Sequence, residues 1–395
     1  MLGANALGCR HGSNAMAIST DAGDSGAPAG GDAGDEGPTP DLGTDAPPAA
    51  GPPPGESWAR TFDRGMGYAD RARAVAMGAD GTVVVAGETQ QVMAPGDLDV
   101  WVRKYDAAGN ELWTRTYDSA PGDGLGDDQG YAVAVDGSGA VVVTGVAHRK
   151  LWLRRYDPSG TESWTVTGET GAGRGLAIDE SGNVVVAGES IGLRKYDGQG
   201  TEILRKPTPG LDAAALALAP DGSIAIVGST PAIRADLVVR KLGAGGDELW
   251  SRSFDGGGDD RGFAVAVDGA GNVIAGGTAF SPEQTRQTLW LRKYDGAGAA
   301  LWTRDGEYGS AVAIVSDATG ALVVADGLAH SFVLRKYDGA GNVLWATSNG
   351  PDVVGRRYPL ALALGDQGLA VAGWVTVKNM VFAPPEDVFV VKYGP

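Results

Sequence analysis

The sequence is short of the residues on which most catalytic and metal sites depend. Cysteine occurs once, as Cys9, and histidine three times, as His11, His148 and His330. A single cysteine excludes an intramolecular disulfide. The chain also lacks an HExxH motif, a GxSxG motif and any Cys/His cluster. We therefore predict no catalytic residue, no metal site and no cofactor.

Long apolar runs and positive charge are also scarce. No stretch approaches the roughly 18 apolar residues that a membrane-spanning helix needs. The 32 Lys and Arg residues face 49 Asp and Glu residues, so the formal net charge is −17. Nucleic acids and anionic bilayers are bound through clustered basic residues. The composition therefore predicts no nucleic-acid partner and no transmembrane segment.

The first 55 residues differ from the rest of the chain in composition. Residues 17–55 are almost wholly Ala, Gly, Asp, Pro, Ser and Thr. Such a segment cannot bury enough apolar surface to offset the entropy lost on ordering. We predict a disordered tail over residues 1–55 and one folded domain over residues 56–395.

Cys9 is a candidate lipidation site within this tail. Ala6-Leu7-Gly8-Cys9 resembles a bacterial lipobox, in which a small residue precedes the cysteine. The basic segment and apolar run of a signal peptide are absent before it, so we expect translation to start upstream of Met1. The alternative is that Cys9 is a free thiol on a flexible end.

A strand motif with a basic pair and an aromatic anchor occurs seven times between Val100 and Tyr393. The anchors recur at intervals of 40 to 56 residues, which is typical of propeller blades and too long for most solenoids. The pattern therefore predicts an all-β, seven-bladed β-propeller. The anchors are Tyr105, Tyr156, Tyr196, Leu242, Tyr294, Tyr337 and Tyr393.

Each repeat unit is expected to form four strands, and the strand at the N-terminal end is expected to supply the fourth strand of the last unit. The first strand alternates Ala with larger residues (AVAVD from Ala132), and the second is a β-branched run (VVVTG from Val141). The basic strand is third, and a tryptophan strand such as LWTRTY from Leu112 is fourth. Residues 57–62 form an extra fourth strand, while the last unit stops at its third. We therefore predict that the N-terminal strand closes the ring.

The polar repeats are expected to be structural. Turns such as Asp268-Gly269-Ala270-Gly271-Asn272 suit backbone-capping by Asp and positive φ at Gly, and they lack the twelfth-position acid of a calcium loop. The recurring Arg–Lys pairs are expected to cover the outer strands, with their stems packed and their charged heads in water.

Two resemblances follow from these units. YAVAVDGSGAVVVTG from Tyr131 and WLRRYDPSGTESWT from Trp152 resemble the bacterial seven-bladed β-propeller repeat family over Glu56–Pro395. That resemblance implies export and no defined chemistry. Residues 105–113 also look like the tryptophan-docking motif of quinoprotein dehydrogenases and outer-membrane assembly scaffolds. The eight blades, cysteines and metal-ligand signatures of quinoprotein rings are missing here. We therefore interpret this likeness as a hairpin and a mode of tryptophan docking that the proteins share.

Loop lengths favour a binding function. The loops between third and fourth strands have a fixed length, whereas those between second and third strands, and from one unit to the next, vary. In an up-and-down blade the two variable classes lie on one face. We predict an exported, surface-tethered monomer that binds a protein or glycan. The alternatives are a periplasmic carboxylate-dependent hydrolase or lyase with its site in the central funnel, and a structural surface protein without a specific ligand.

Two sets of residues are candidate binding residues. The insert at residues 374–385 contains Trp374, Asn379, Met380 and Phe382, and aromatic and Met side chains are enriched at recognition surfaces. The alternative is that this insert covers or lengthens its own blade. His148 and His330 lie in loops three blades apart and could face each other across the mouth of the ring.

Overall fold

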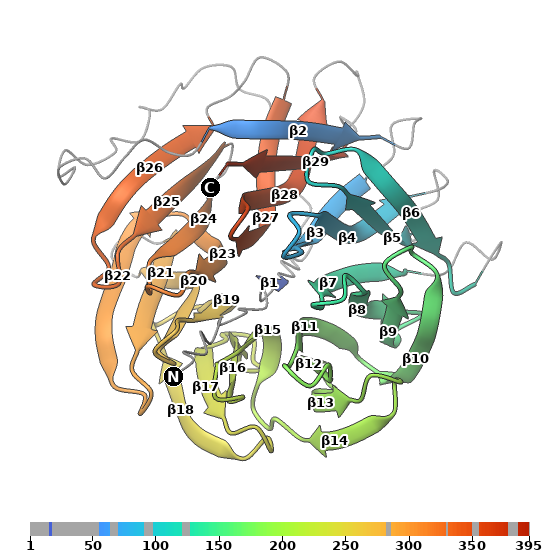
Figure 1. Ribbon diagram of the computed structural model, residues 1–395. Coiled ribbons are helices and arrows are strands. Elements are labelled where there is room, and N and C mark those ends of the chain that lie inside the picture. The colour runs from blue at the N-terminus through green and yellow to red at the C-terminus, as the bar shows by residue number, and fades with distance from the viewer. Residues whose placement is uncertain are drawn as a thin grey trace, which may run out of the picture.

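A computed structural model describes residues 16–17, 55–63, 70–90, 98–120, 127–281, 286–328, 331–349, 355–377 and 386–394. These residues form seven sheets of antiparallel strands arranged around one axis (Figure 1). No α-helix occurs in them, and hence none that could cross a membrane. The predicted all-β, seven-bladed propeller is confirmed.

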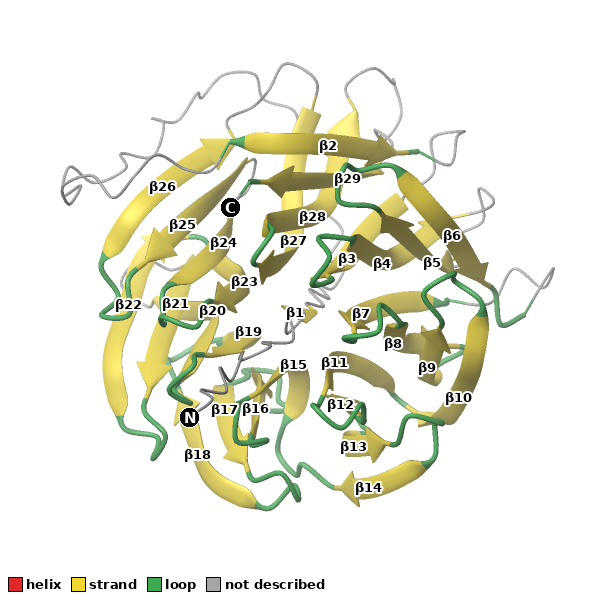
Figure 2. Cartoon of the chain, viewed as in Figure 1, coloured by secondary structure: helices red, strands yellow, loops and turns green. Residues whose placement is uncertain are grey.

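The strands fall into four concentric layers (Figure 2). The innermost are β3 (Asp70–Met77), β7 (Gln129–Val135), β11 (Ala172–Ile178), β15 (Asp212–Leu218), β19 (Arg261–Val267), β23 (Ser310–Ser316) and β27 (Gly355–Gly365). The second are β4 (Val83–Gln90), β8 (Val141–Ala147), β12 (Val184–Glu189), β16 (Ile224–Ser229), β20 (Val273–Ser281), β24 (Leu322–Leu328) and β28 (Gly368–Val377).

The outer layers follow the same order. The third strands are β5 (Leu98–Tyr105), β9 (Lys150–Tyr156), β13 (Gly192–Tyr196), β17 (Leu237–Leu242), β21 (Arg286–Tyr294), β25 (Ser331–Tyr337) and β29 (Glu386–Tyr393). The fourth are β6 (Glu111–Tyr117), β10 (Glu162–Thr170), β14 (Glu202–Lys206), β18 (Glu248–Phe254), β22 (Ala300–Tyr308), β26 (Val343–Asn349) and β2 (Glu56–Phe62). Blades 1 to 7 are numbered in the order of their innermost strands.

Side-chain size decides the layering. Ala132 and Ala134 of β7 are buried, and their small side chains let seven innermost strands converge near the axis. Val141, Val142 and Val143 of β8 have no exposed surface, because both faces of a second strand are covered by neighbouring blades. The hydrophobic core is therefore a ring of inter-blade layers.

The N-terminal strand closes the ring as predicted. β2 pairs antiparallel with β29, with Trp58 opposite Lys392 and Phe62 opposite Val388. Blade 7 is thus built from both ends of the described chain, in the order β2-β29-β28-β27. Where other blades have a covalent turn, the Gly394 amide donates to the Gly55 carbonyl oxygen at 3.0 Å.

One short strand precedes β2. β1 (Met16–Ala17) pairs with β3, with Met16 opposite Val75, and lies at the hub near all seven innermost strands (Figure 1). The remainder of the predicted tail, including Cys9, lies outside the described residues. Its disorder and lipidation therefore stay predictions.

Tryptophans of the fourth strands join neighbouring blades. Each indole Nε1 donates to a carbonyl oxygen in the third-to-fourth-strand turn of the next blade. The five pairs are Trp58–Ala107 (3.0 Å), Trp113–Pro158 (3.1 Å), Trp164–Gly198 (3.0 Å), Trp250–Gly296 (3.1 Å) and Trp302–Gly339 (3.1 Å). The predicted docking of the tryptophans is confirmed at these junctions.

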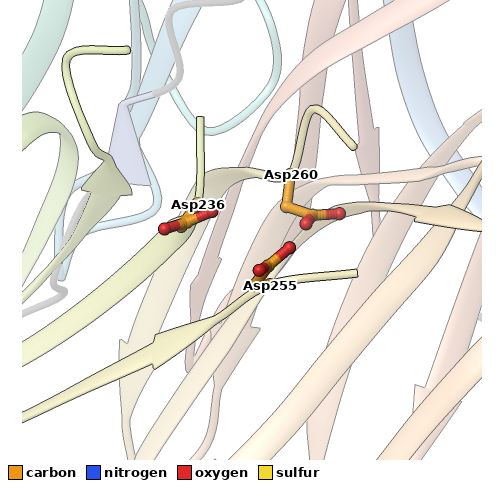
Figure 3. A group of neighbouring side chains, drawn as sticks. All are labelled: Asp236, Asp255 and Asp260. Atoms are coloured by element: carbon orange, nitrogen blue, oxygen red, sulfur yellow. The ribbon is translucent and has the colours of Figure 1, made fainter. Parts of the chain in front are cut away.

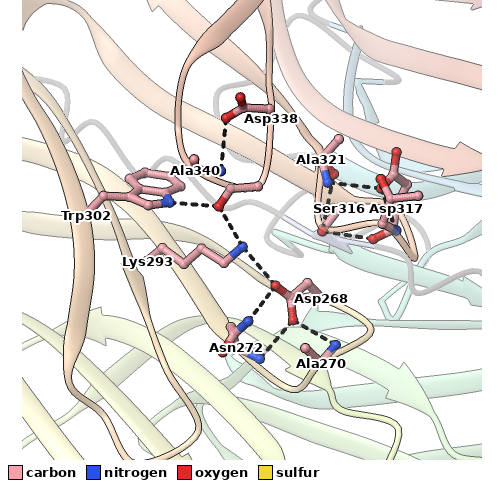
Figure 4. Close-up of polar contacts among 12 residues, drawn as sticks. Asp268, Ala270, Asn272, Lys293, Trp302, Ser316, Asp317, Ala321, Asp338 and Ala340 are labelled. Carbon is pink, nitrogen blue, oxygen red and sulfur yellow. Dashed lines mark hydrogen bonds and ion pairs between the residues drawn. The ribbon is translucent and has the colours of Figure 1, made fainter.

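The lysines of the third strands behave differently from our expectation. Lys104, Lys241, Lys293 and Lys392 are at most 5% exposed, so the prediction of charged heads in water was wrong for them. Lys293 Nζ lies 2.9 Å from Asp268 and donates to the Gly339 carbonyl oxygen at 3.1 Å (Figure 4). Turn carbonyl groups and a turn aspartate satisfy the ammonium group, which allows its burial.

Candidate functional site

The two faces of the disc are built differently. Twelve five-residue turns join first to second or third to fourth strands, and we call the side that carries them the turn face. In each turn, the backbone amide of the first residue donates to the carbonyl oxygen of the fifth residue. The amide of the fourth residue donates to the carbonyl oxygen of the first. They start at residues 78, 106, 136, 157, 179, 197, 219, 243, 268, 295, 317 and 338.

Nine of the twelve turns begin with an aspartate whose carboxylate accepts hydrogen bonds from amides of the same turn. Asp338 Oδ1 accepts a hydrogen bond from the Ala340 amide at 2.9 Å (Figure 4). It accepts a second one from the Asn342 amide at 2.8 Å. A bond from the Asn342 side-chain amide to Oδ2, together with these backbone bonds, lowers the pKa of Asp338. The structural interpretation of the Asp-x-x-Gly turns is therefore confirmed, since their carboxylates are engaged with their own backbone.

The opposite side, which we call the loop face, carries the loops between second and third strands and those between blades. Because successive strands of a blade are antiparallel neighbours, both loop classes emerge there. Their described lengths range from Gly309 alone, between β22 and β23, to the segment 230–236 between β16 and β17. Among the described residues most of the variation in length therefore lies on the loop face, and on the turn face the two-residue turn between β27 and β28 departs from the common pattern.

Trp374 lies on the loop-face side of blade 7, within a strand. The sequence placed it in a loop, whereas β28 extends to Val377. Its ring stacks on Tyr358 of β27, with 3.8 Å between centroids, and the Arg71 guanidinium lies 5.7 Å from the indole centroid. Arg71 also forms an ion pair with Glu386 of β29. The described part of the insert, residues 374–377, therefore lengthens its own blade, as in the alternative considered above, while residues 378–385 lie outside the described residues.

The other predicted binding residues are not brought together by the described structure. His148 is exposed in the two-residue loop between β8 and β9, where its amide donates to Asp128 at 3.0 Å. His330, Asn379, Met380 and Phe382 lie outside the described residues. Whether His148 and His330 face each other stays a prediction.

The structure adds one exposed residue that the sequence analysis missed. Ile233, in the loop 230–236, is fully exposed. The loop is held closed beneath it, because the Thr230 amide donates to the Asp236 carbonyl oxygen at 2.9 Å and the Asp236 amide donates to Thr230 Oγ1 at 2.9 Å. An apolar residue between Pro231 and Arg234, outside any strand pattern, was the available signal.

Acidic residues gather at two blade junctions of the loop face. Asp236, Asp255 and Asp260 each offer a carboxylate oxygen, and these oxygens lie within 4.8 Å of one another (Figure 3). At the other junction, burial and the charges of Asp63 and Asp70 raise the pKa of Asp387 to about 6. Asp387 belongs to the third strand from the axis, so this group lies between blades and away from the hub.

A shallow cavity of about 280 Å³ occurs between blades 1 and 2. It is lined by polar and charged side chains of the outer strands and one turn, among them Arg115, Arg154 and Glu162. Arg115 Nε donates to the Gly160 carbonyl oxygen at 2.7 Å, and Arg154 lies 3.3 Å from Glu162. Arg115 is thus engaged in the contact between the blades, and Arg154 in an ion pair within blade 2.

Comparison with known proteins supports the fold alone. No protein-family model and no curated protein matches the chain. Among solved structures, the RRP9 WD40 repeats are 11% identical, with a TM-score of 0.59 over 86% of this chain and 98% of theirs. U3-55K is 11% identical, with a TM-score of 0.59 over 86% of this chain and 100% of that one. The Neurospora crassa Pan2 WD40 domain is 11% identical, with a TM-score of 0.53 over 80% of this chain and 88% of that one. The chain is similar to WD40 propellers in architecture.

Proposed function

We propose that the protein is an exported binding module that recognises a protein ligand through its loop face. The observation that carries this proposal is the difference between the faces. Twelve turns of one hydrogen-bonding pattern hold the turn face rigid, while differing loops are displayed on the other side. Rigid scaffolds with variable loops on one side are how binding surfaces are commonly built. The propeller fold is consistent with a protein-binding or scaffold module.

Ile233 is the residue on which we centre the ligand contact. An isolated, fully exposed isoleucine contributes nothing to the core, but it would bury apolar area against a partner. A protein ligand can supply an apolar pocket for it. A glycan ligand would rely more on the Tyr358–Trp374 stack, whose facing ring surfaces are already in contact.

The test is capture of ligand from an envelope extract of the source organism by immobilised protein, followed by affinity measurement with the isolated ligand. We expect Ile233→Ser to weaken binding about tenfold or more, which corresponds to about 1.4 kcal/mol. The matched control is Leu249→Ser in the same blade, because Leu249 is 58% exposed on the outer strand that starts at the turn face. Equal affinities of the two variants would contradict the proposal. Capture of a glycan and of no protein would show that the ligand is a glycan.

Membership of the bacterial seven-bladed repeat family and tethering through Cys9 are parts of the same proposal. They rest on the repeat units and on the lipobox-like Ala6–Cys9 segment. Expression from the genomic locus, with the sequence upstream of Met1 included, should give a protein that incorporates labelled palmitate. Cys9→Ser should lose the label, and unlabelled wild-type protein would exclude the anchor.

A second candidate function, that of a carboxylate-dependent hydrolase or lyase, has one observation in its favour, which lies between blades 7 and 1 and not in the central funnel. The pKa of Asp387 is raised to about 6 beside two other carboxylates, as a general acid requires. Screening glycosides and polyuronates with the wild type and Asp387→Asn would decide. An activity that the variant loses would establish an enzyme, and an inactive wild type would remove this candidate.

A further inference from the structure

The third strands of blades 1 to 6 carry an arginine two residues before the anchor residue, and in five of these blades the chain supplies it with a carboxylate. In blade 6, Arg335 pairs with Asp326 of β24. In blades 1 to 4 the partner is a glutamate that opens the fourth strand. These pairs are Arg103–Glu111 (3.3 Å), Arg154–Glu162 (3.3 Å), Arg194–Glu202 (3.0 Å) and Arg240–Glu248 (3.5 Å).

Blade 5 keeps the arginine, Arg292, and lacks the carboxylate. Ala300 opens β22 and lies opposite Tyr294, where blade 2 has Glu162 opposite its own tyrosine. Within the described ranges no carboxylate, Asp305 of the same strand included, forms an ion pair with Arg292. Its guanidinium group is therefore the one among the six whose charge the described chain leaves without a carboxylate.

The threonine that helps to hold the carboxylate elsewhere is also present in blade 5. In blade 2, Thr165 Oγ1 accepts a hydrogen bond from Arg154 at 2.7 Å and donates one to Glu162 at 2.8 Å. In blade 5, Thr303 Oγ1 accepts a bond of 2.8 Å from Arg292 Nε. Because Ala300 replaces the glutamate, the Thr303 hydroxyl hydrogen lacks the acceptor that its counterpart has.

A second arginine reaches the same place from blade 4. Arg252 of β18 donates from Nε to the Gly298 carbonyl oxygen at 2.9 Å. The junction between blades 1 and 2 has the same contact, in which Arg115 donates to Gly160. There, the arginines of both blades and Glu162 line the cavity of about 280 Å³ described above. The matching place between blades 4 and 5 has both guanidinium groups and an alanine instead of the glutamate.

We propose that the rim between blades 4 and 5 binds a carboxylate group of a ligand, in the place that Glu162 fills between blades 1 and 2. Arg292 and Thr303 bind its oxygens, and Arg252 adds a second positive charge from the neighbouring blade. Charge-assisted hydrogen bonds from a planar guanidinium group suit a carboxylate. The site lies on the outermost strands beside the turn face, so it is independent of binding through the loop face.

The test is an NMR titration of arginine-labelled protein with sodium acetate at low ionic strength. We expect the Arg292 Nε–Hε resonance to shift and saturate with a Kd of about 1–10 mM. Ala300→Glu restores the arrangement of blade 2 and should weaken acetate binding at Arg292 at least about tenfold, because the tethered carboxylate competes. Glu162→Ala should create a second acetate site at Arg154. Ala300 and Glu162 are exposed, so both variants should fold.

Ala297→Glu is the charge-matched control, because Ala297 is exposed in the same turn and its counterpart Ser159 does not line the cavity. It should change acetate affinity by no more than about twofold. A wild-type protein without a saturable shift at Arg292 would overturn the proposal, as would undiminished binding in Ala300→Glu. Tighter binding of phosphate than of acetate would contradict the choice of a carboxylate.

A peptide probe identifies the source of the carboxylate. Acetyl-Gly-Glu-Gly-amide is titrated beside acetate, with the glutamine peptide as its uncharged control. Tighter binding of the glutamate peptide than of acetate would assign the site to an acidic side chain of a protein ligand. Tighter binding of acetate would assign it to a small free carboxylate, and binding of the glutamine peptide as tightly as the glutamate peptide would overturn recognition of the charge.

Discussion

The indole Nε1 of Trp58 donates a hydrogen bond of 3.0 Å to the carbonyl oxygen of Ala107, 49 residues further along the chain. Trp58 belongs to β2, the outermost strand of blade 7, and Ala107 to the β5–β6 turn of blade 1. Arg60 adds a second bond, from Nε to the Gly109 carbonyl oxygen at 2.8 Å. The junction at which the ring closes thus uses the contacts found between blades 1 and 2, where Trp113 and Arg115 meet Pro158 and Gly160.

Two N-terminal truncations test ring closure. Among the described contacts, a protein beginning at Glu56 loses those of the two-residue strand β1 and the Gly55 carbonyl group but retains β2, so it should melt within about 3 °C of the full chain. A protein beginning at Gly65 loses β2 and with it buried Trp58, and it exposes the edge of β29. Loss of a buried aromatic alone costs about 3–5 kcal/mol, which for a domain of this size lowers Tm by about 4–7 °C, and loss of the β2 pairing adds to this. Equal melting temperatures would show that β2 does not close the ring.

Replacement of tryptophan by phenylalanine tests the inter-blade hydrogen bond. Trp113→Phe keeps an aromatic ring but loses the bond to the Pro158 carbonyl oxygen. The control is Trp345→Phe, since blade 7 has no covalent third-to-fourth-strand turn for Trp345 to meet. Urea unfolding should find Trp113→Phe less stable than the control by about 1 kcal/mol. A larger loss at Trp345 would contradict the assigned role.

Glycine replacements test how closely the indole covers its turn. Gly109 has φ of 81°, and an added Cβ would lie 2.6 Å from Cδ2 of Trp58. Gly182 has φ of 79°, yet nothing would lie within 4 Å of its Cβ. Both alanine variants bear the left-handed strain of about 1–2 kcal/mol. Gly109→Ala should cost about 1–3 kcal/mol more, and equal losses in thermal unfolding would refute the close contact.

Asp387 predicts a pH dependence of stability. Burial and the charges of Asp63 and Asp70 raise its pKa from 3.8 to about 6. The folded state therefore holds the proton more tightly than the unfolded state, so this group lowers stability as pH rises from about 4 to about 6. Asp387→Asn should melt above the wild type at pH 7 and level with it at pH 4. A constant difference across this range would contradict the assignment.

Most of the fold could be predicted from residues that recur at the same position of each repeat unit. Anchors such as Tyr105 and Tyr156 mark third strands, and the alternation at Ala132–Val135 marks a first strand, because strand pairing within a blade is local in sequence. Ser57–Phe62 matched the tryptophan strands so closely that its place in blade 7 followed from strand number alone.

Contacts between blades were harder to predict. Asp236 and Asp255 adjoin Leu237 and Phe254, which pair within blade 4, but the approach of Asp260 to them depends on how blade 5 packs against blade 4. The burial of Lys293 depends on the Gly339 carbonyl of the next blade. The end of β28 depends on the stack of Trp374 on Tyr358, which no local pattern indicates. Side-chain partners across a junction are set by three-dimensional geometry, which the repeat leaves open.

Recognition through the loop face is the central claim, and hydrogen–deuterium exchange with and without the isolated ligand tests it most directly. We predict slower exchange on binding in loop-face segments such as 230–236 and 255–260, with no change in turns such as 106–110 and 243–247. Protection of the turns, with the loop-face segments unchanged, would contradict the account.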